Sequence, residues 1–85
     1  MFFRKKKYKV KLKGKSGLDY FEGKKKMDIS SEFMSGSNGI IIYSDSIKKW
    51  KSPYEADEIS EQHKSEILDN ITENLNAYDI PVEWL

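Results

Sequence analysis

The single histidine of the chain is His63, and it stands three residues before Glu66 in a His-x-x-Glu spacing on an expected helix. An imidazole and a carboxylate can both bind zinc, but a zinc site needs at least three protein ligands, and the metalloprotease motif needs two histidines four residues apart. The chain has no cysteine that could supply further ligands. We therefore expect His63 to be a solvated helix residue, and we predict no metal site.

A second short pattern, Gly14-Lys15-Ser16, matches the end of a phosphate-binding P-loop. The complete motif requires another glycine five residues before Gly14, and Lys9 occupies that position. A P-loop also leads into a helix, whereas a strand is expected here, so the pattern is more typical of a hairpin turn. No Gly-x-Ser-x-Gly nucleophile elbow occurs either. The sequence predicts no catalytic residue, no cofactor and no enzymatic activity.

Acidic residues are concentrated in the last part of the chain. Residues 52–85 contain nine acids and one lysine, whereas residues 1–26 contain eleven basic residues and two acids. Four of the acids lie close together, but no calcium-binding loop of twelve residues with a central glycine can be written through them. They form either a solvated edge or a surface for a basic partner, and the composition leaves both interpretations open. These four residues are Glu55, Asp57, Glu58 and Glu61.

The basic first third of the chain is the main argument for nucleic-acid binding. Lysines neutralise phosphates, and the aromatic residues interleaved with them can stack on bases. Against this, Arg4 is the only arginine, Tyr8 shares the apolar side of its expected strand, and the acidic third would repel a polyanion. A small nucleic-acid-binding module is therefore the alternative function. Its expected contacts are Lys9, Lys11, Lys13 and Lys15.

Length and composition indicate a single domain over residues 1–85. Hydrophobic residues make up 38% and charged residues 34%, which predicts a folded core with a highly charged exterior. The absence of cysteine excludes disulfides. Residues 1–7 are a basic lead-in that we expect to be frayed. With no secretory signal and no apolar run of about 20 residues, we expect a cytoplasmic protein without a membrane partner.

The residue pattern predicts an α+β fold that begins with strands. Apolar and basic residues alternate strictly from Tyr8 to Lys13, which is typical of a strand with one side toward a core. Further strands are expected at 18–22, around Met27 to Phe33 and at Ile40 to Tyr43, joined by Gly- and Ser-rich turns. Short connections make these four strands an antiparallel meander. The unbroken run of β-branched and aromatic residues from Ile40 to Tyr43 is expected in the middle of the core.

The second half of the sequence predicts one long helix that packs on one face of the sheet. Ser60 is suited to cap its start, and Pro81 disfavours its continuation. Ile80 to Trp84 then alternate as a fifth strand, and Pro81 indicates either that this strand lies at a sheet edge or that proline stands at its first residue. The sheet is expected to have four to five strands. A short helical turn near 44–50 should place Ile47 and Trp50 on one face. The apolar stripe of the long helix consists of Ile67, Leu68, Ile71, Leu75 and Tyr78.

Several short motifs lie one after another between residues 27 and 85. They are a short strand ending in Tyr, a Ser-Ile-Lys-x-Trp turn, Pro-Tyr, an acidic bend, an Ile-Ser helix start and a last strand that alternates apolar residues with Glu. They stand at Ile42-Tyr43, Ser46 to Trp50, Pro53-Tyr54, Glu55 to Glu58, Ile59-Ser60 and Ile80 to Trp84. With these motifs the chain resembles the immunity protein 74 family of bacterial polymorphic toxin systems. It departs from the family at Ser31-Glu32, where Gly-Glu is common, and at Ser52-Pro53, where two prolines are common.

The resemblance implies a non-catalytic protein that binds and neutralises one cognate toxin domain, encoded next to it, in contact-dependent inhibition between bacteria. If that toxin is a nuclease with a basic cleft, the acidic back of the long helix can occupy the cleft and steer association. Aromatic residues often anchor interfaces, although Trp50, Pro53 and Tyr54 can also be read as a small satellite core. The expected toxin-binding residues are Trp50, Tyr54, Glu55, Asp57, Glu58 and Glu61.

Overall fold

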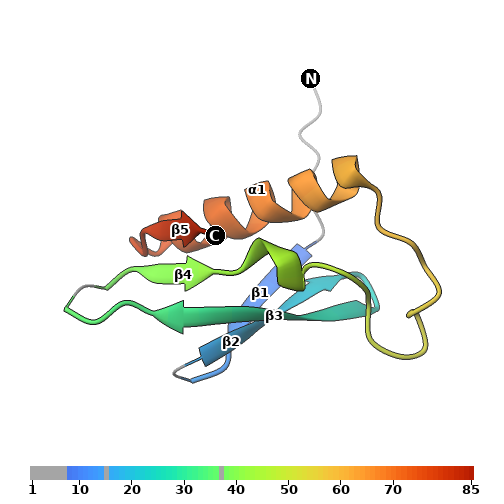
Figure 1. Ribbon diagram of the computed structural model, residues 1–85, viewed down its shortest axis with the longest axis horizontal. Coiled ribbons are helices and arrows are strands. Elements are labelled where there is room, and N and C mark those ends of the chain that lie inside the picture. The colour runs from blue at the N-terminus through green and yellow to red at the C-terminus, as the bar shows by residue number, and fades with distance from the viewer. Residues whose placement is uncertain (1–7, 15, 37) are drawn as a thin grey trace.

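The computed structural model describes residues 8–14, 16–36 and 38–85, so the basic lead-in 1–7 lies outside the described residues. The expected α+β class is confirmed: one helix lies over one face of a five-stranded sheet with the order β1-β2-β3-β4-β5 (Figure 1). The elements are β1 (Tyr8–Leu12), β2 (Ser16–Glu22), β3 (Lys25–Phe33), β4 (Ile40–Ile42), the 3-10 turn η1 (Ser44–Ser46), α1 (Glu61–Ala77) and β5 (Val82–Trp84).

The first four strands form the predicted antiparallel meander. Glu22 pairs with Lys25, so only two residues turn the chain from β2 into β3. Gly23 has a φ of +60° in this turn, a conformation that glycine adopts without steric cost. The register of this hairpin places Leu18 opposite Ile29 and therefore sets which side chains share the core face.

The fifth strand runs parallel to β4, with Ile40 opposite Val82. It does not continue the antiparallel pattern, because α1 crosses the sheet between the two strands and returns the chain to the end where β4 starts. Pro81 precedes the strand, and its carbonyl accepts a hydrogen bond from the Ile40 N–H at 2.9 Å. β4 lies between β3 and β5, so the middle strand of the sheet is β3. Ile40 and Ile42 are nevertheless part of the core.

After β4 the chain continues along the edge of β3. The Tyr43 N–H donates to the Ser30 carbonyl at 3.0 Å, and further on the Lys51 N–H donates to the Lys26 carbonyl at 2.8 Å. The helical turn expected near 44–50 is present but covers only η1, because these bonds to β3 take the place of further helical bonds. Ile47 and Trp50 are both buried, as the pattern predicted.

Helix α1 begins where the sequence predicted. The Ser60 hydroxyl accepts a hydrogen bond from the His63 N–H at 3.0 Å and so caps the helix. The predicted apolar stripe is correct except at Tyr78, which is 72% exposed. The helix ends at Ala77, so Tyr78 is the residue after its last turn, and Asp79 follows with a φ of +60°.

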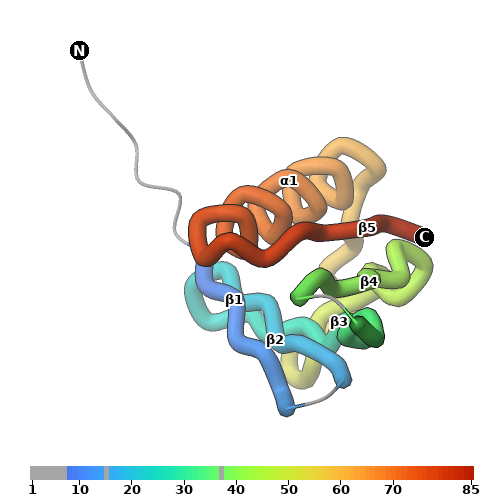
Figure 2. The backbone as a smooth tube through the Cα atoms, turned by 90° about the vertical axis from the view of Figure 1, so that its left-hand side faces the viewer, coloured from blue at the N-terminus to red at the C-terminus, as the bar shows by residue number. Residues whose placement is uncertain are grey.

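The core lies between α1 and the sheet face beneath it (Figure 2). Trp50 is among its largest side chains and is 2% exposed. Its ring stacks against Tyr20 of β2 with 6.3 Å between centroids and lies 5.9 Å from the ring of His63 on α1. Trp50 therefore connects the sheet, the loop after η1 and the helix. The buried apolar residues are Leu18, Tyr20, Met27, Ile29, Ile40, Ile42, Ile47, Trp50, Ile67, Ile71 and Leu75.

Replacing Trp50→Ala should lower the free energy of unfolding by about 3–5 kcal/mol, because it opens a large cavity in the core. Tyr78→Ala, which truncates an exposed ring, should stay within about 0.5 kcal/mol of the wild type. Urea denaturation followed by circular dichroism measures both. Equal losses for the two variants would contradict the assignment of Trp50 to the core.

Candidate functional site

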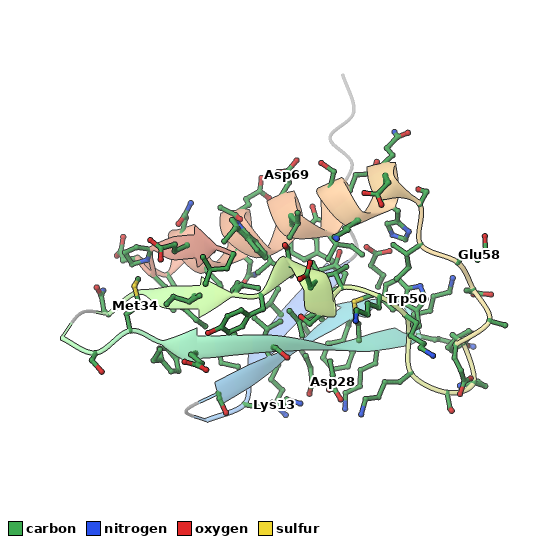
Figure 3. The ribbon with its side chains drawn as sticks, in the orientation of Figure 1. Lys13, Asp28, Met34, Trp50, Glu58 and Asp69 are labelled. Carbon is green, nitrogen blue, oxygen red and sulfur yellow. The ribbon has the colours of Figure 1, made fainter. Side chains whose placement is uncertain are left out.

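A continuous series of exposed carboxylates follows the loop after Trp50 and then the outward side of α1. We call Glu55, Glu58, Glu61, Glu66 and Asp69 the acidic surface. Figure 3 shows Glu58 pointing outward from the loop and Asp69 pointing away from the sheet. Within residues 8–14, 16–36 and 38–85, none of these five residues lies within ion-pair distance of a basic group. Their charge is therefore directed at solvent or at a partner.

The loop that carries the first acids is fixed to the sheet by Lys25. The Lys25 ammonium lies 2.7 Å from the Asp57 carboxylate, 5.7 Å from the centre of the Trp50 ring and 5.9 Å from that of Tyr54. A cation above aromatic faces and beside a carboxylate is attracted by all three groups. Asp57, predicted as a contact residue, is thus held by a neighbouring cation and positions the loop.

Two further residues of the predicted contact set differ in what they expose. Trp50 belongs to the core, so its buried side chain lies beneath the acidic surface. It is not a residue that a partner can contact. Tyr54 is half-buried and packs against the core, which leaves part of its ring accessible. The satellite core considered for these aromatic residues is in fact continuous with the main core.

A local interaction further favours the charged form of Glu55. The Ser52 hydroxyl donates a hydrogen bond to the Glu55 carboxylate, and this bond holds the pKa of Glu55 below its ordinary value. Glu58 and Glu61 are exposed on either side of the residues that lead into α1. Glu61 occupies the first turn of the helix, where its charge opposes the positive end of the helix dipole.

The described lysines considered for nucleic acid, Lys9, Lys11 and Lys13, lie on the opposite side of the sheet, which α1 does not cover and which we call the open face. Lys9 and Lys11 are exposed there and are opposite Phe21 and Asp19 across the β1–β2 pairing. Lys13 is engaged by acids of the neighbouring strands, and Figure 3 shows it on the side of the sheet away from α1. Lys15 lies outside the described residues.

Two acids at the centre of the open face neutralise part of its positive charge. Asp19, which is 5% exposed, lies 3.4 Å from Lys13 and 3.5 Å from Lys26. Asp28, opposite Asp19 in the pairing, forms ion pairs with Lys51 and with Lys13, the latter at 2.9 Å. Hydrogen bonds from these two lysines, the Lys51 bond first, hold the pKa of Asp28 far below its ordinary value. This cluster was not predicted from the sequence, although the tight turn at Gly23 places Asp19 opposite Asp28.

His63 is half-buried and hydrogen-bonded, in contrast to the solvated residue that was expected. Its Nε2 lies 2.8 Å from the Glu22 carboxylate, which also accepts a 2.6 Å hydrogen bond from the Tyr20 hydroxyl. The Asn70 amide donates to the same hydroxyl at 2.9 Å. Burial, followed by the bond to Glu22, raises the pKa of Tyr20. This network joins β2 to α1. Within the described ranges no group of three metal-ligating side chains gathers around His63 or elsewhere.

Ser46 and Lys49 have the spacing of a Ser-x-x-Lys nucleophile and base, so the expectation that the sequence contains no such motif was wrong. The Ser46 hydroxyl donates to the Tyr43 carbonyl at 2.6 Å and accepts from the Ser30 N–H at 2.9 Å. The bond from Ser30 holds η1 against β3, and the bond to Tyr43 closes the turn itself, so both give this hydroxyl a structural role. No helix among the described residues has the length and apolar character needed to cross a membrane.

Among known proteins, a protein-family model described as Immunity protein 74 matches residues 9–84, which is nearly the whole chain. The match includes the basic strands that precede the motifs between residues 27 and 85. No curated protein and no solved structure matches the chain.

Replacing Lys25→Met should release the loop over residues 52–58. The loss of one ion pair and of two cation–π contacts should lower the free energy of unfolding by about 1–2 kcal/mol. Hydrogen exchange of the loop amides should accelerate more than exchange in β3. Lys24→Met, at the neighbouring exposed lysine, is the matched control. Equal effects of the two variants would contradict the conclusion that the Lys25 contacts fix the loop.

Replacing Asp28→Asn should lower the free energy of unfolding at pH 7 by about 1 kcal/mol, because exposed ion pairs contribute modestly. The pKa of Asp28 is lower in the folded than in the unfolded protein, so its stabilisation is complete above the ordinary carboxyl value of about 4 and decreases as the pH falls below it. The difference between variant and wild type should therefore shrink by pH 2.5.

Urea titrations at the two pH values test the role of Asp28. Asp45→Asn, at an exposed acid without an ion pair among the described residues, is the control. A destabilisation that is independent of pH would show that the Asp28 carboxylate acts through its shape alone.

Proposed function

The chain belongs to the immunity protein 74 family, and from this premise we propose that it neutralises one cognate toxin domain by binding it through the acidic surface. Family membership implies an immunity protein, which acts by binding and needs no catalytic residue. The partner we propose is a protein domain encoded next to this chain. The observation that carries the choice of surface is the series of five exposed carboxylates without counter-ions among the described residues.

Charge is separated between two sides of the molecule, which supports this choice. Glu61, Glu66 and Asp69 occupy the outward side of α1, whereas the open face carries lysines of β1 and β3. Two acids partly neutralise the open face, but the acidic surface keeps its charge. A concentrated negative field accelerates encounter with a basic partner and orients it. A nuclease, whose cleft must attract nucleic acid, is the class of toxin that fits this field.

The acidic surface is also pre-organised for binding. The Lys25 contacts fix the loop, and the Ser60 cap fixes the first turn of α1 that follows it. Side chains that are already held by a rigid backbone lose less conformational entropy when they bind. Tyr54, with its ring partly accessible beside the acids, provides an apolar anchor at the edge of the surface.

Nucleic-acid binding has less support as a second function. Of the four lysines considered for it, Lys13 is paired with Asp19 and Asp28, and Lys15 lies outside the described residues. Lys9 and Lys11 alone provide two phosphate contacts, whereas tight and salt-sensitive binding to duplex DNA rests on about six to ten. The balance of charges therefore favours a protein partner.

Reversing two charges, Glu58→Lys with Glu61→Lys, should weaken neutralisation when the chain is co-expressed with the protein encoded beside it. Toxicity should be suppressed by the wild type and should return with the variant. With purified proteins, the association rate should fall by about tenfold or more, because rim charges act mainly on the encounter. Stopped-flow fluorescence at several salt concentrations measures this rate.

The control variant is Glu32→Lys with Glu83→Lys, which makes the same change in net charge at exposed positions on β3 and β5. It should keep neutralisation close to the wild type. If both double variants weaken binding equally, net charge and not the acidic surface determines association. If the wild type suppresses no toxicity from any neighbouring protein, the proposed function loses its basis.

A further inference from the structure

Strand β1 is an edge strand with a free row of backbone groups. In the described part of the chain β2 pairs with one side of it, and no strand lies on the other. The Lys13 N–H donates to the Gly17 carbonyl at 3.0 Å, so Lys13, Lys11 and Lys9 direct their backbone groups toward β2. Because alternate residues of an antiparallel pair point to opposite sides, the N–H and C=O groups of Tyr8, Val10 and Leu12 point outward.

An apolar groove lies beside this free edge, between β1 and the end of α1. It has a volume of about 430 Å³. Tyr78, which follows the last turn of the helix and is 72% exposed, is one of its lining residues. Its lining is mostly apolar and consists of Val10, Lys11, Leu12, Asn74, Leu75, Tyr78 and Ile80.

The two sides of β1 therefore have different chemistry. Val10 and Leu12 line the groove on the side of α1, and Lys9 and Lys11 are exposed on the open face without an ion pair among the described residues. An extended chain that pairs with the free edge would place alternate side chains on these two sides. Apolar side chains would enter the groove, and acidic side chains would lie next to the lysines.

We propose that β1 accepts an additional strand from the protein partner, an extended segment that alternates acidic and apolar residues. The inference rests on the proposed function in that the cognate toxin supplies this strand, and it adds the edge of β1 as a second contact region besides the acidic surface. Main-chain hydrogen bonds to Tyr8, Val10 and Leu12 provide affinity, and Lys9 and Lys11 select the acidic residues.

The same lysines argue against a second copy of this chain as the occupant. Pairing β1 with another β1 would bring lysines next to lysines on the open face, and like charges in adjacent strands destabilise a sheet. Lysines on edge strands are a known device against self-association. Lys9 and Lys11 thus reject one kind of strand and attract another, which is how specificity is commonly obtained.

The probe is an eight-residue synthetic peptide of alternating Glu and Val, tested against the full chain in the absence of any toxin. The peptide should bind, and hydrogen exchange measured by NMR should slow at the outward amides of Tyr8, Val10 and Leu12. A peptide with Lys in place of Glu should bind at least tenfold more weakly. Failure of the Glu peptide to slow exchange at these three amides would overturn the inference.

Variants separate this edge from general charge effects. Lys9→Glu with Lys11→Glu should weaken the Glu peptide at least tenfold, whereas Lys48→Glu with Lys49→Glu, the same charge change at exposed loop residues, should leave it within about twofold. Equal weakening by both pairs would contradict a site at β1. The peptide assay contains no toxin, so its result is independent of neutralisation in co-expressing cells. Failure of the peptide alone would overturn the site at β1, and failure of neutralisation alone would overturn the proposed function.

Discussion

The burial of Trp50 is the interaction on which the arrangement of this molecule depends. Its ring lies against Tyr20 of β2 and His63 of α1, and the Lys25 ammonium of β3 lies 5.7 Å from its centre. One side chain from an irregular segment therefore fixes the distance between sheet and helix. It also holds the start of the loop that carries Glu55 and Glu58, so packing in the core positions this part of the acidic surface. Aromatic residues commonly dominate the packing energy of small domains in this way.

The second organising feature is the separation of charge by secondary structure. Strands with a period of two place the lysines on the open face, and the helix places its acids on the side away from the sheet. Asp19 and Asp28 compensate part of the lysine charge at the centre of the open face, which stabilises three adjacent strands where the lysines would otherwise repel one another. The acidic surface has no comparable compensation among the described residues, and for this reason we propose it as the side that a basic partner contacts.

Local patterns were sufficient to predict the elements but not all of their partners. The Ser60 cap, the apolar stripe of α1 and the meander follow from short-range chemistry, so the sequence predicted them. The parallel pairing of β5 depends on where a whole helix returns the chain, and Tyr78 lies beyond the last turn of the helix, which ends at Ala77. Among the candidate site residues, exposure of Glu58 and Glu61 followed from polarity. The burial of Trp50 and the contacts of Lys25 with the loop arise between segments that are distant in the sequence, and hydrophobic periodicity does not predict such contacts.

We propose that the toxin contacts this chain through the acidic surface. Hydrogen–deuterium exchange of the chain, alone and in complex with the protein encoded beside it, tests this most directly. We expect amides of residues 54–69 to gain protection on binding, together with a second region at the edge of β1. Protection confined to the open face and absent from residues 54–69 would contradict the account, because it would place the partner on the side of the sheet opposite the helix.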